Sequence, residues 1–238
     1  MQLNDIVTAV VLSVLPLVVI VPIGALAYSA VGERVRGLVP GIVLMEGSFL
    51  LVAVGYLWFV GGVNVRLGLL SGPELVLALA LVPAPFALSV ATERVRSLLD
   101  AEGEKTLNLS RESVPAALIV ALVLVGPAEE LLYRGIVQPL LVDSLGAVAG
   151  IGVMATLFGA VHYPSYGADS PLDVDRGVVI GCLSTGLVGA GLGALFVVTG
   201  SLLAPIVTHS LYDAALFAKA AVENDETGEG PRSDVGRQ

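Results

Sequence analysis

The sequence predicts an all-α fold, a polytopic transmembrane helix bundle of about seven to eight spans. The mean hydropathy is +0.89. Hydrophobic residues make up 55% of the 238 positions, more than the core of a soluble domain of this length requires. Several apolar runs reach the ~20 residues that a helix needs to cross the hydrocarbon of a bilayer. The runs are long and unbroken, whereas a spanning β-barrel shows short alternating strands.

Seven apolar segments are expected to be the spans. They cover residues 6–28, 38–63, 73–91, 114–142, 145–161, 178–198 and 202–221. The first is too long, and too poor in basic residues ahead of it, for a cleaved signal peptide. The second ends near Tyr56 and Trp58, which favour a membrane interface. Pro83 and Pro85 predict a kink or break in the third, because proline removes a helical hydrogen bond.

The fourth segment follows a polar stretch at 92–112 and begins with cap residues and Pro115. At 1.5 Å per residue it would reach about 43 Å, so it must tilt, kink at Pro127 or protrude. The fifth segment ends at His162, and the sixth is rich in glycine, which permits close helix packing. The seventh contains both a histidine and an aspartate.

The chain therefore divides into N-terminal transmembrane helices with a polar loop (1–112), a helical core (113–221) and an acidic tail expected to be disordered (222–238). The net charge of −9 arises from acidic loops and this tail, which argues against nucleic acid as a partner. The single cysteine, Cys182, excludes an intrachain disulfide and is expected to be a small buried hydrophobe.

Three polar groups interrupt the apolar segments of the core. Glu129, Glu130 and Arg134 lie in the fourth segment, and Glu130 and Arg134 are four residues apart, so they share a helix face and can pair. Glu129 is rotated by about 100° from Glu130 and can point elsewhere. Such a helix offers one paired carboxylate and one available as a general base. The alternative is a buried charge cluster that only fixes helix packing.

The two histidines of the chain supply the other two groups. His162 ends the fifth segment, while His209 and Asp213 are four residues apart in the seventh and suit an imidazole held by a carboxylate. Alone, His162 fits an interfacial or hydrogen-bonded histidine better than a catalytic one, and the pair of His209 and Asp213 fits a helix-stabilising contact equally well. Ionisable residues at membrane depth mark functional sites by default, and together these groups predict one shared pocket. Glu46 is a further candidate carboxylate, although its place near a helix end favours contact with headgroups or a neighbouring polar group.

Two kinds of hydrolytic site fit these residue types. Two histidines and a carboxylate can bind zinc, whose catalytic sites use three protein ligands and leave one position for water; here these would be Glu129, His162 and His209. A glutamate can also activate water without a metal, with histidines that position the water or stabilise an oxyanion. The sequence has no Gly-x-Ser-x-Gly, His-Glu-x-x-His or phosphate-binding loop, so serine-hydrolase, zincin and nucleotide sites lack support.

The ordered motifs Glu129-Glu130-x-x-x-Arg134, Phe158-x-x-x-His162 and His209-x-x-x-Asp213 resemble those of the CPBP (ABI) family, the CAAX prenyl endopeptidases and bacteriocin-processing intramembrane proteases. The resemblance covers roughly residues 114–221, the catalytic helical core. It implies an intramembrane endopeptidase whose substrate is a membrane-associated peptide or a prenylated protein. The protein is expected to be a multi-pass protein of the cell membrane.

By motif position, the resemblance implies that Glu129 is the base, supported by Glu130 and Arg134. His162 would share in holding the water, and His209 with Asp213 would hold the water or stabilise the oxyanion. Because an ionised Asp213 can accept but not donate a hydrogen bond, the oxyanion role rests more on His209. The family has been regarded both as metalloproteases and as metal-free glutamate peptidases, so zinc remains a candidate cofactor.

Two alternative functions use the same residues. A proton- or ion-coupled transporter would use the carboxylates and histidines as a relay, although the sequence shows no clear inverted repeat. A non-catalytic membrane protein would use the core to bind a partner within the bilayer.

Overall fold

The computed structural model describes residues 3–31, 38–99, 101, 112–166 and 175–227. All of the regular elements in this part of the chain are helical. They are α1 (Leu3–Leu15), η1 (Pro16–Ile20), α2 (Val21–Val31), α3 (Leu38–Phe59), α4 (Gly72–Leu81), α5 (Pro83–Leu98), α6 (Val114–Val120), η3 (Ala121–Val125), α7 (Gly126–Leu132), η4 (Tyr133–Val137), α8 (Gln138–Leu145), α9 (Ala147–Val161), η5 (Tyr163–Tyr166), α10 (Arg176–Thr199) and α11 (Leu203–Thr227).

The predicted helix bundle is confirmed, since every one of the seven expected spans contains helix. Five helical stretches among the described residues are long and apolar enough to cross a bilayer: Asn4–Leu26, Val39–Phe59, Gly72–Leu98, Val114–Leu145 and Arg176–Thr199. The fifth expected span, 145–161, contains α9 (Ala147–Val161), which is apolar but shorter. The seventh, α11, is 25 residues long but also carries the polar residues of the site.

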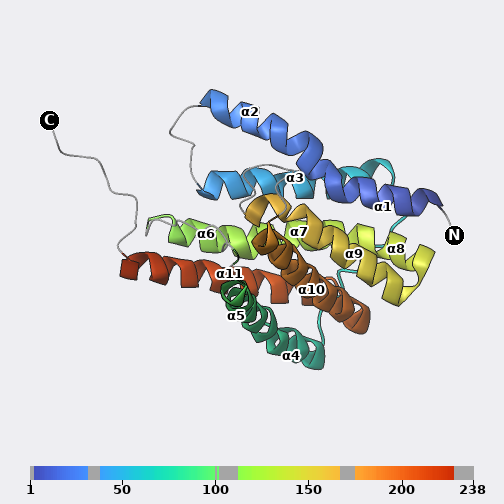
Figure 1. The fold of residues 1–238 in the computed structure, drawn as a ribbon. Coiled ribbons are helices and arrows are strands. Elements are labelled where there is room, and N and C mark those ends of the chain that lie inside the picture. Colours follow the sequence, from blue (N-terminus) through green and yellow to red (C-terminus); the bar gives the residue numbers. More distant parts are fainter. Residues whose placement is uncertain (1–2, 32–37, 100, 102–111, 167–174, 228–238) are drawn as a thin grey trace.

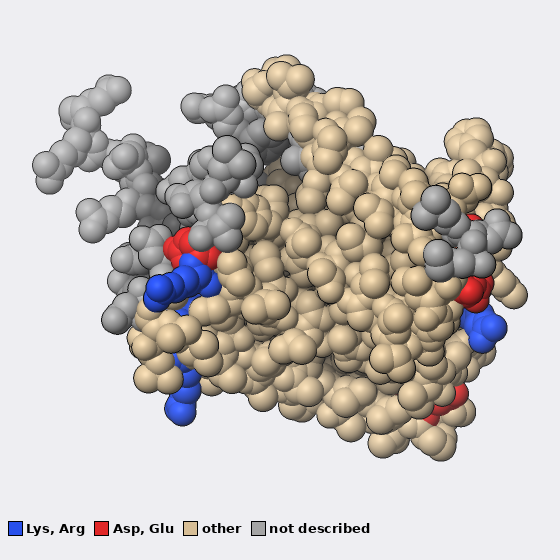
Figure 2. All heavy atoms as spheres, turned by 45° about the vertical axis from the view of Figure 1, so that its right-hand side comes forward, with Lys and Arg blue, Asp and Glu red and all other residues tan. Residues whose placement is uncertain are grey.

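The surface matches a bundle that sits in a bilayer. Figure 2 shows a broad band of uncharged residues, with the lysine, arginine, aspartate and glutamate side chains gathered toward two opposite edges. Large apolar side chains such as Leu51, Trp58 and Leu183 are more than half exposed in the isolated protein. In water such a surface would be an unusually large apolar patch, so lipid is the solvent that it fits.

The row formed by α6, α7 and α8 lies in the middle of the molecule (Figure 1). Helices α1, α2 and α3 cover one side of this row, and α11, α5 and α4 lie on the other. Tyr133, Leu132 and Ala128 from the central row are fully buried and pack in one apolar cluster with Phe49 and Ala53 of α3. The central helix is thus enclosed by protein, which is where polar side chains can be placed away from lipid.

The central helix contains two π-helical segments, η3 and η4, one on each side of α7. Proline lacks a backbone N–H, so Pro127 in the first turn of α7 leaves a carbonyl of the preceding turn without its usual donor. The wider turn of η3 accommodates this missing hydrogen bond, at the position where the sequence predicted a kink. Single-turn π segments occur frequently at functional sites, and here they flank the two glutamates.

The third expected span is broken where its prolines predicted, because α4 ends at Leu81 and α5 begins at Pro83. Two other helix boundaries differ from expectation. Helix α5 continues through part of the stretch expected to be a polar loop, to Leu98, stabilised by an ion pair between Arg96 and Glu93 at 2.7 Å. Helix α11 continues to Thr227, and the remainder of the expected acidic tail, from residue 228, lies outside the described residues.

Candidate active site

Glu129 and Glu130 lie on α7, and Arg134 follows one turn later in η4. The relative exposure of these residues is 3%, 0% and 0%, respectively. Helix α7 can cross α11 closely because Gly126 has no side chain: a Cβ at this position would meet the backbone N of Ser210 at 3.0 Å. This close approach brings the glutamates of α7 beside the histidine of α11.

Arg134 holds Glu130 and α10 together. Its Nη1 donates to Oε1 of Glu130 at 2.9 Å, as the spacing predicted, and its Nη2 donates to the carbonyl oxygen of Gly189 at 2.9 Å. The guanidinium also lies 4.5 Å from the centre of the Phe158 ring, a cation–π distance. One turn further on, Gln138 donates to the carbonyl oxygen of Gly193 at 3.0 Å. The glycine-rich helix α10 is therefore tied to the central helix at two successive turns.

His209 on α11 reaches both glutamates. Its Nδ1 donates to Oε1 of Glu130 at 2.7 Å, the same oxygen that accepts from Arg134. Its Nε2 lies 3.4 Å from Oδ2 of Asp213 and 3.8 Å from Oε2 of Glu129. The expected partnership of His209 with Asp213 is present, but its shortest contact is with Glu130.

His162 approaches Glu129 from the end of α9. Its Nδ1 lies 2.7 Å from the carbonyl oxygen of Phe158, and since a carbonyl only accepts, Nδ1 carries the proton. In the neutral ring Nε2 is then an acceptor, and it lies 3.6 Å from Oε1 of Glu129. Phe158 packs between the two imidazoles, with ring centres 4.8 Å from His162 and 6.2 Å from His209.

The two oxygens of Glu129 thus face the Nε2 atoms of two different histidines. Both separations exceed a direct hydrogen bond, and a water that lies to the side of either pair can contact both of its atoms. The side chain of Glu129 is 4% exposed, whereas those of Asp213 and His162 are 14% and 21% exposed. Access to the cluster therefore lies on the side of His162 and Asp213.

All six expected site residues meet in this one cluster, which draws on α7, η4, α9 and α11. Glu46 on α3 was considered as a further candidate carboxylate, with contact to headgroups or a neighbouring polar group as the favoured interpretation. It is 1% exposed and close enough for the charges of Glu129 and Asp213 to act on it, so it lies inside the protein and not among headgroups. The signal that pointed to it is an acidic residue within an apolar span. Sequence reasoning missed Gln138, although it continues the helical stripe of Glu130 and Arg134.

The donor groups do not fit the zinc site that the sequence allowed. In the part of the chain that the structure describes, no three His, Cys, Asp or Glu side chains are placed to hold a metal ion. The Nδ1 atoms of His162 and His209 are engaged by Phe158 and Glu130, as the second ring nitrogen of a metal-binding histidine usually is, so only the Nε2 atoms could bind a metal. These Nε2 atoms face different oxygens of Glu129. Zinc requires its ligand atoms to converge at about 2.0–2.2 Å from one point.

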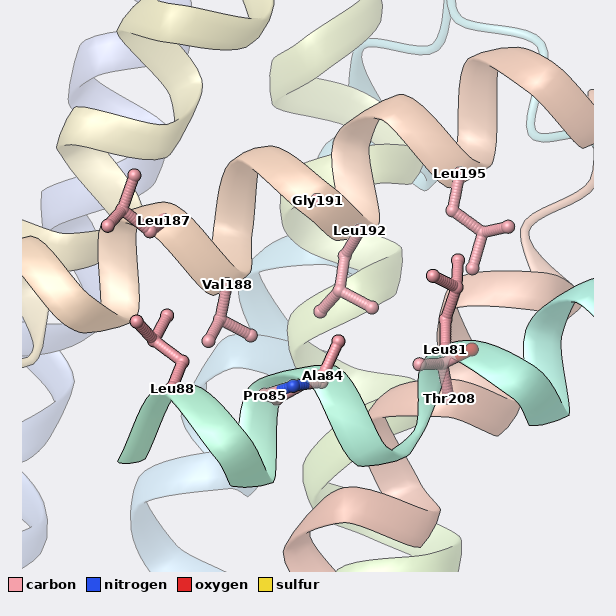
Figure 3. Close-up of a pocket in the computed structure, with 10 residues that line it drawn as sticks. All are labelled: Leu81, Ala84, Pro85, Leu88, Leu187, Val188, Gly191, Leu192, Leu195 and Thr208. Carbon is pink, nitrogen blue, oxygen red and sulfur yellow. The ribbon is translucent and has the colours of Figure 1, made fainter. Parts of the chain in front are cut away.

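An apolar groove lies beside the cluster, between α4 and α5 on one side and α10 on the other (Figure 3). Leu88 and Pro85 line one wall, Val188 and Leu192 the other, and Thr208 of α11 contributes at one end. The Thr208 hydroxyl lies 2.9 Å from the carbonyl oxygen of Ala78 on α4, whereas the adjacent His209 faces Glu130. The groove is therefore on a different face of α11 from the polar cluster.

Comparison with known proteins identifies the segment that carries this cluster. Residues 111–215 match the family described as type II CAAX prenyl endopeptidase Rce1-like. This match agrees with the CPBP resemblance of the sequence motifs, and it contains all six expected site residues. Neither a curated protein nor a solved structure matches the chain significantly.

Proposed function

We propose that this integral membrane protein, whose residues 111–215 match the family of Rce1-like type II CAAX prenyl endopeptidases, cleaves a peptide bond with a water molecule activated by Glu129. The observation that carries the proposal is the position of the Glu129 carboxylate between the Nε2 atoms of His162 and His209, at 3.6 and 3.8 Å. A water there can be oriented by three polar groups at once.

The hydrolytic step follows from the hydrogen-bonding capacities of these groups. Neutral His162 offers an Nε2 lone pair, so a water between it and Glu129 donates one hydrogen to each. Glu129 takes its proton as the water oxygen attacks the carbonyl carbon of the peptide, and a C–O bond forms. The tetrahedral intermediate then collapses, the C–N bond breaks, and the proton held by Glu129 passes to the leaving amine.

His209 is suited to stabilise the oxyanion of that intermediate. Glu130 fixes Nδ1 as a donor, so in the protonated ring the Nε2–H points toward the space between Glu129 and Asp213. A donor held in advance of the reaction, in a site from which water is largely excluded, is the usual means of oxyanion stabilisation. Glu130 and Arg134 act through His209, and Asp213 orients its other nitrogen.

The substrate class follows from the surroundings of the cluster and from the matched family. A site enclosed by membrane-spanning helices meets peptides that are themselves attached to the bilayer, and a prenylated protein terminus is such a substrate. The cell membrane is the proposed location. A soluble peptide without an anchor is expected to be a poor substrate, because it is not concentrated at the bilayer.

The transporter alternative requires polar groups distributed along a path through the bilayer. The six residues instead form one compact cluster around the adjacent carboxylates of Glu129 and Glu130, which favours hydrolysis. The test is incubation of the purified protein in liposomes with anchored and unanchored versions of the same peptide, with products identified by mass spectrometry. Cleavage of the anchored peptide supports the proposal. Uptake driven by a pH gradient, without cleavage of any peptide, would favour transport, and capture of a peptide without either would favour the non-catalytic alternative.

A further inference from the structure

Glu46 lies on the face of α3 that packs against the central helix. Glu46, Phe49 and Ala53 are spaced at three and four residues, so they form one stripe, and their relative exposures are 1%, 2% and 0%. The Phe49 ring lies 6.1 Å from the ring of Tyr133, which in turn packs edge-on against Phe158 at 5.0 Å. The stripe therefore connects α3 to the aromatic residues that support both histidines.

Among the described residues, the charged groups that act on Glu46 are carboxylates. The charges of Glu129 on α7 and Asp213 on α11 act on it, and Tyr133 of η4 is also within its electrostatic reach. Its Oε2 is buried and has no hydrogen-bond partner among the described residues. Each of the other three carboxylates of the cluster faces a cationic or imidazole nitrogen: Glu129 faces His162, Glu130 faces Arg134 and Asp213 faces His209.

A buried carboxylate without a counter-charge is very costly, and it takes up a proton instead. A further negative charge beside those of Glu129 and Asp213 adds repulsion to that cost. A neutral carboxyl group, by contrast, has an O–H that can donate a hydrogen bond. Carboxylates only accept hydrogen bonds, so such a donor suits a site with two carboxylates nearby. The surroundings of Glu46 thus suit the acid form of the side chain.

We propose that Glu46 is a positioning residue of the site: a neutral carboxylic acid on α3 that donates a hydrogen bond to a water, through which it is linked to the carboxylates of Glu129 and Asp213. It lies outside the segment matched to the family, so the N-terminal helices contribute to the chemistry of the core. The effect on catalysis rests on the proposed peptidase function, whereas the neutral state of Glu46 does not.

Kinetic comparison of Glu46→Gln and Glu46→Leu tests the positioning role. Gln keeps a neutral donor, so its kcat is expected to stay within about threefold of wild type; Leu removes the donor, and kcat is expected to fall about tenfold or more with little change in KM. Ser48→Ala is the matched control, because Ser48 is equally buried on α3 but its hydroxyl bonds within its own helix, to Met45. Unfolding temperatures of all three variants identify any loss caused by misfolding.

Two kinetic results would overturn the positioning role: equal losses for Gln and Leu, which would require an ionised Glu46, or full activity of Glu46→Leu. Infrared difference spectra of wild type against Glu46→Gln at neutral pH test the neutral state without any substrate. The C=O band of a protonated carboxylic acid is expected in wild type only. Ionised carboxylate bands in its place would refute the acid form, even if the protein cleaves no peptide.

Discussion

His209 and Glu130 are joined by a 2.7 Å hydrogen bond from Nδ1 to Oε1, and the same oxygen accepts from Arg134 at 2.9 Å. One carboxylate oxygen therefore connects α7, η4 and α11. This arrangement gives the adjacent glutamates different tasks: Glu130 is committed to two donors, whereas both oxygens of Glu129 face nitrogen atoms across longer separations.

Because Glu130 acts through His209, the two residues should behave as one unit in a double-mutant cycle. Glu130→Gln and His209→Gln are each expected to lower kcat/KM, and the double variant is expected to lose little more than His209→Gln alone. The measurement is the kcat/KM of the four proteins on one anchored peptide. Losses that multiply independently would contradict the coupling.

Arg134 is expected to matter for stability as well as activity. Arg134→Met leaves the buried Glu130 without its main counter-charge and should destabilise the protein by about 3–5 kcal/mol. Thermal unfolding in detergent measures the effect. Arg94→Met is the control, since Arg94 is exposed on α5. The double variant Glu130→Gln with Arg134→Met is expected to recover stability but not activity; no recovery would mean that the packing of Arg134 on Phe158 and Gly189 dominates.

The packing of α9 against α10 can be tested by substituting two glycines of α9, Gly159 and Gly152. A Cβ on Gly159 would lie 3.1 Å from the backbone N of Gly186, and closer still to the carbonyl oxygen of Cys182, whereas a Cβ on Gly152 would meet nothing within 4 Å. Gly159→Ala should therefore destabilise by about 1–3 kcal/mol. Gly152→Ala should be neutral or stabilising by up to about 1 kcal/mol, because alanine favours helix. Equal unfolding temperatures for the two variants would refute this packing.

The arrangement of the donor groups predicts activity that does not depend on zinc. Treatment with a strong chelator, followed by removal of the chelator–metal complex, should leave the rate of cleavage unchanged. Metal content by atomic spectroscopy should not correlate with activity between preparations. A loss of activity that added zinc restores would contradict the metal-free mechanism and return Glu129, His162 and His209 to the role of ligands.

The bundle and its polar groups could be predicted because both depend on local sequence. Long apolar runs predict spans, and the four-residue spacing of Glu130 with Arg134 and of His209 with Asp213 predicts contacts on one helix face. The contact between His209 and Glu130 joins residues 79 positions apart, so it cannot be predicted from the spacing of residues along a helix. The burial of Glu46 likewise depends on how α3 packs, and the π segments depend on how the helix accommodates Pro127.

The position of Glu129 between two histidines is tested most directly by the rate at which Glu129→Gln cleaves an anchored peptide in liposomes, compared with wild type and with Glu112→Gln, a glutamate exposed just before α6. Gln cannot accept the proton of the attacking water, so the rate is expected to fall at least about 100-fold. The unfolding temperatures of both variants, and the cleavage rate of Glu112→Gln, should stay near those of wild type. Cleavage by Glu129→Gln at the wild-type rate would show that another group activates the water.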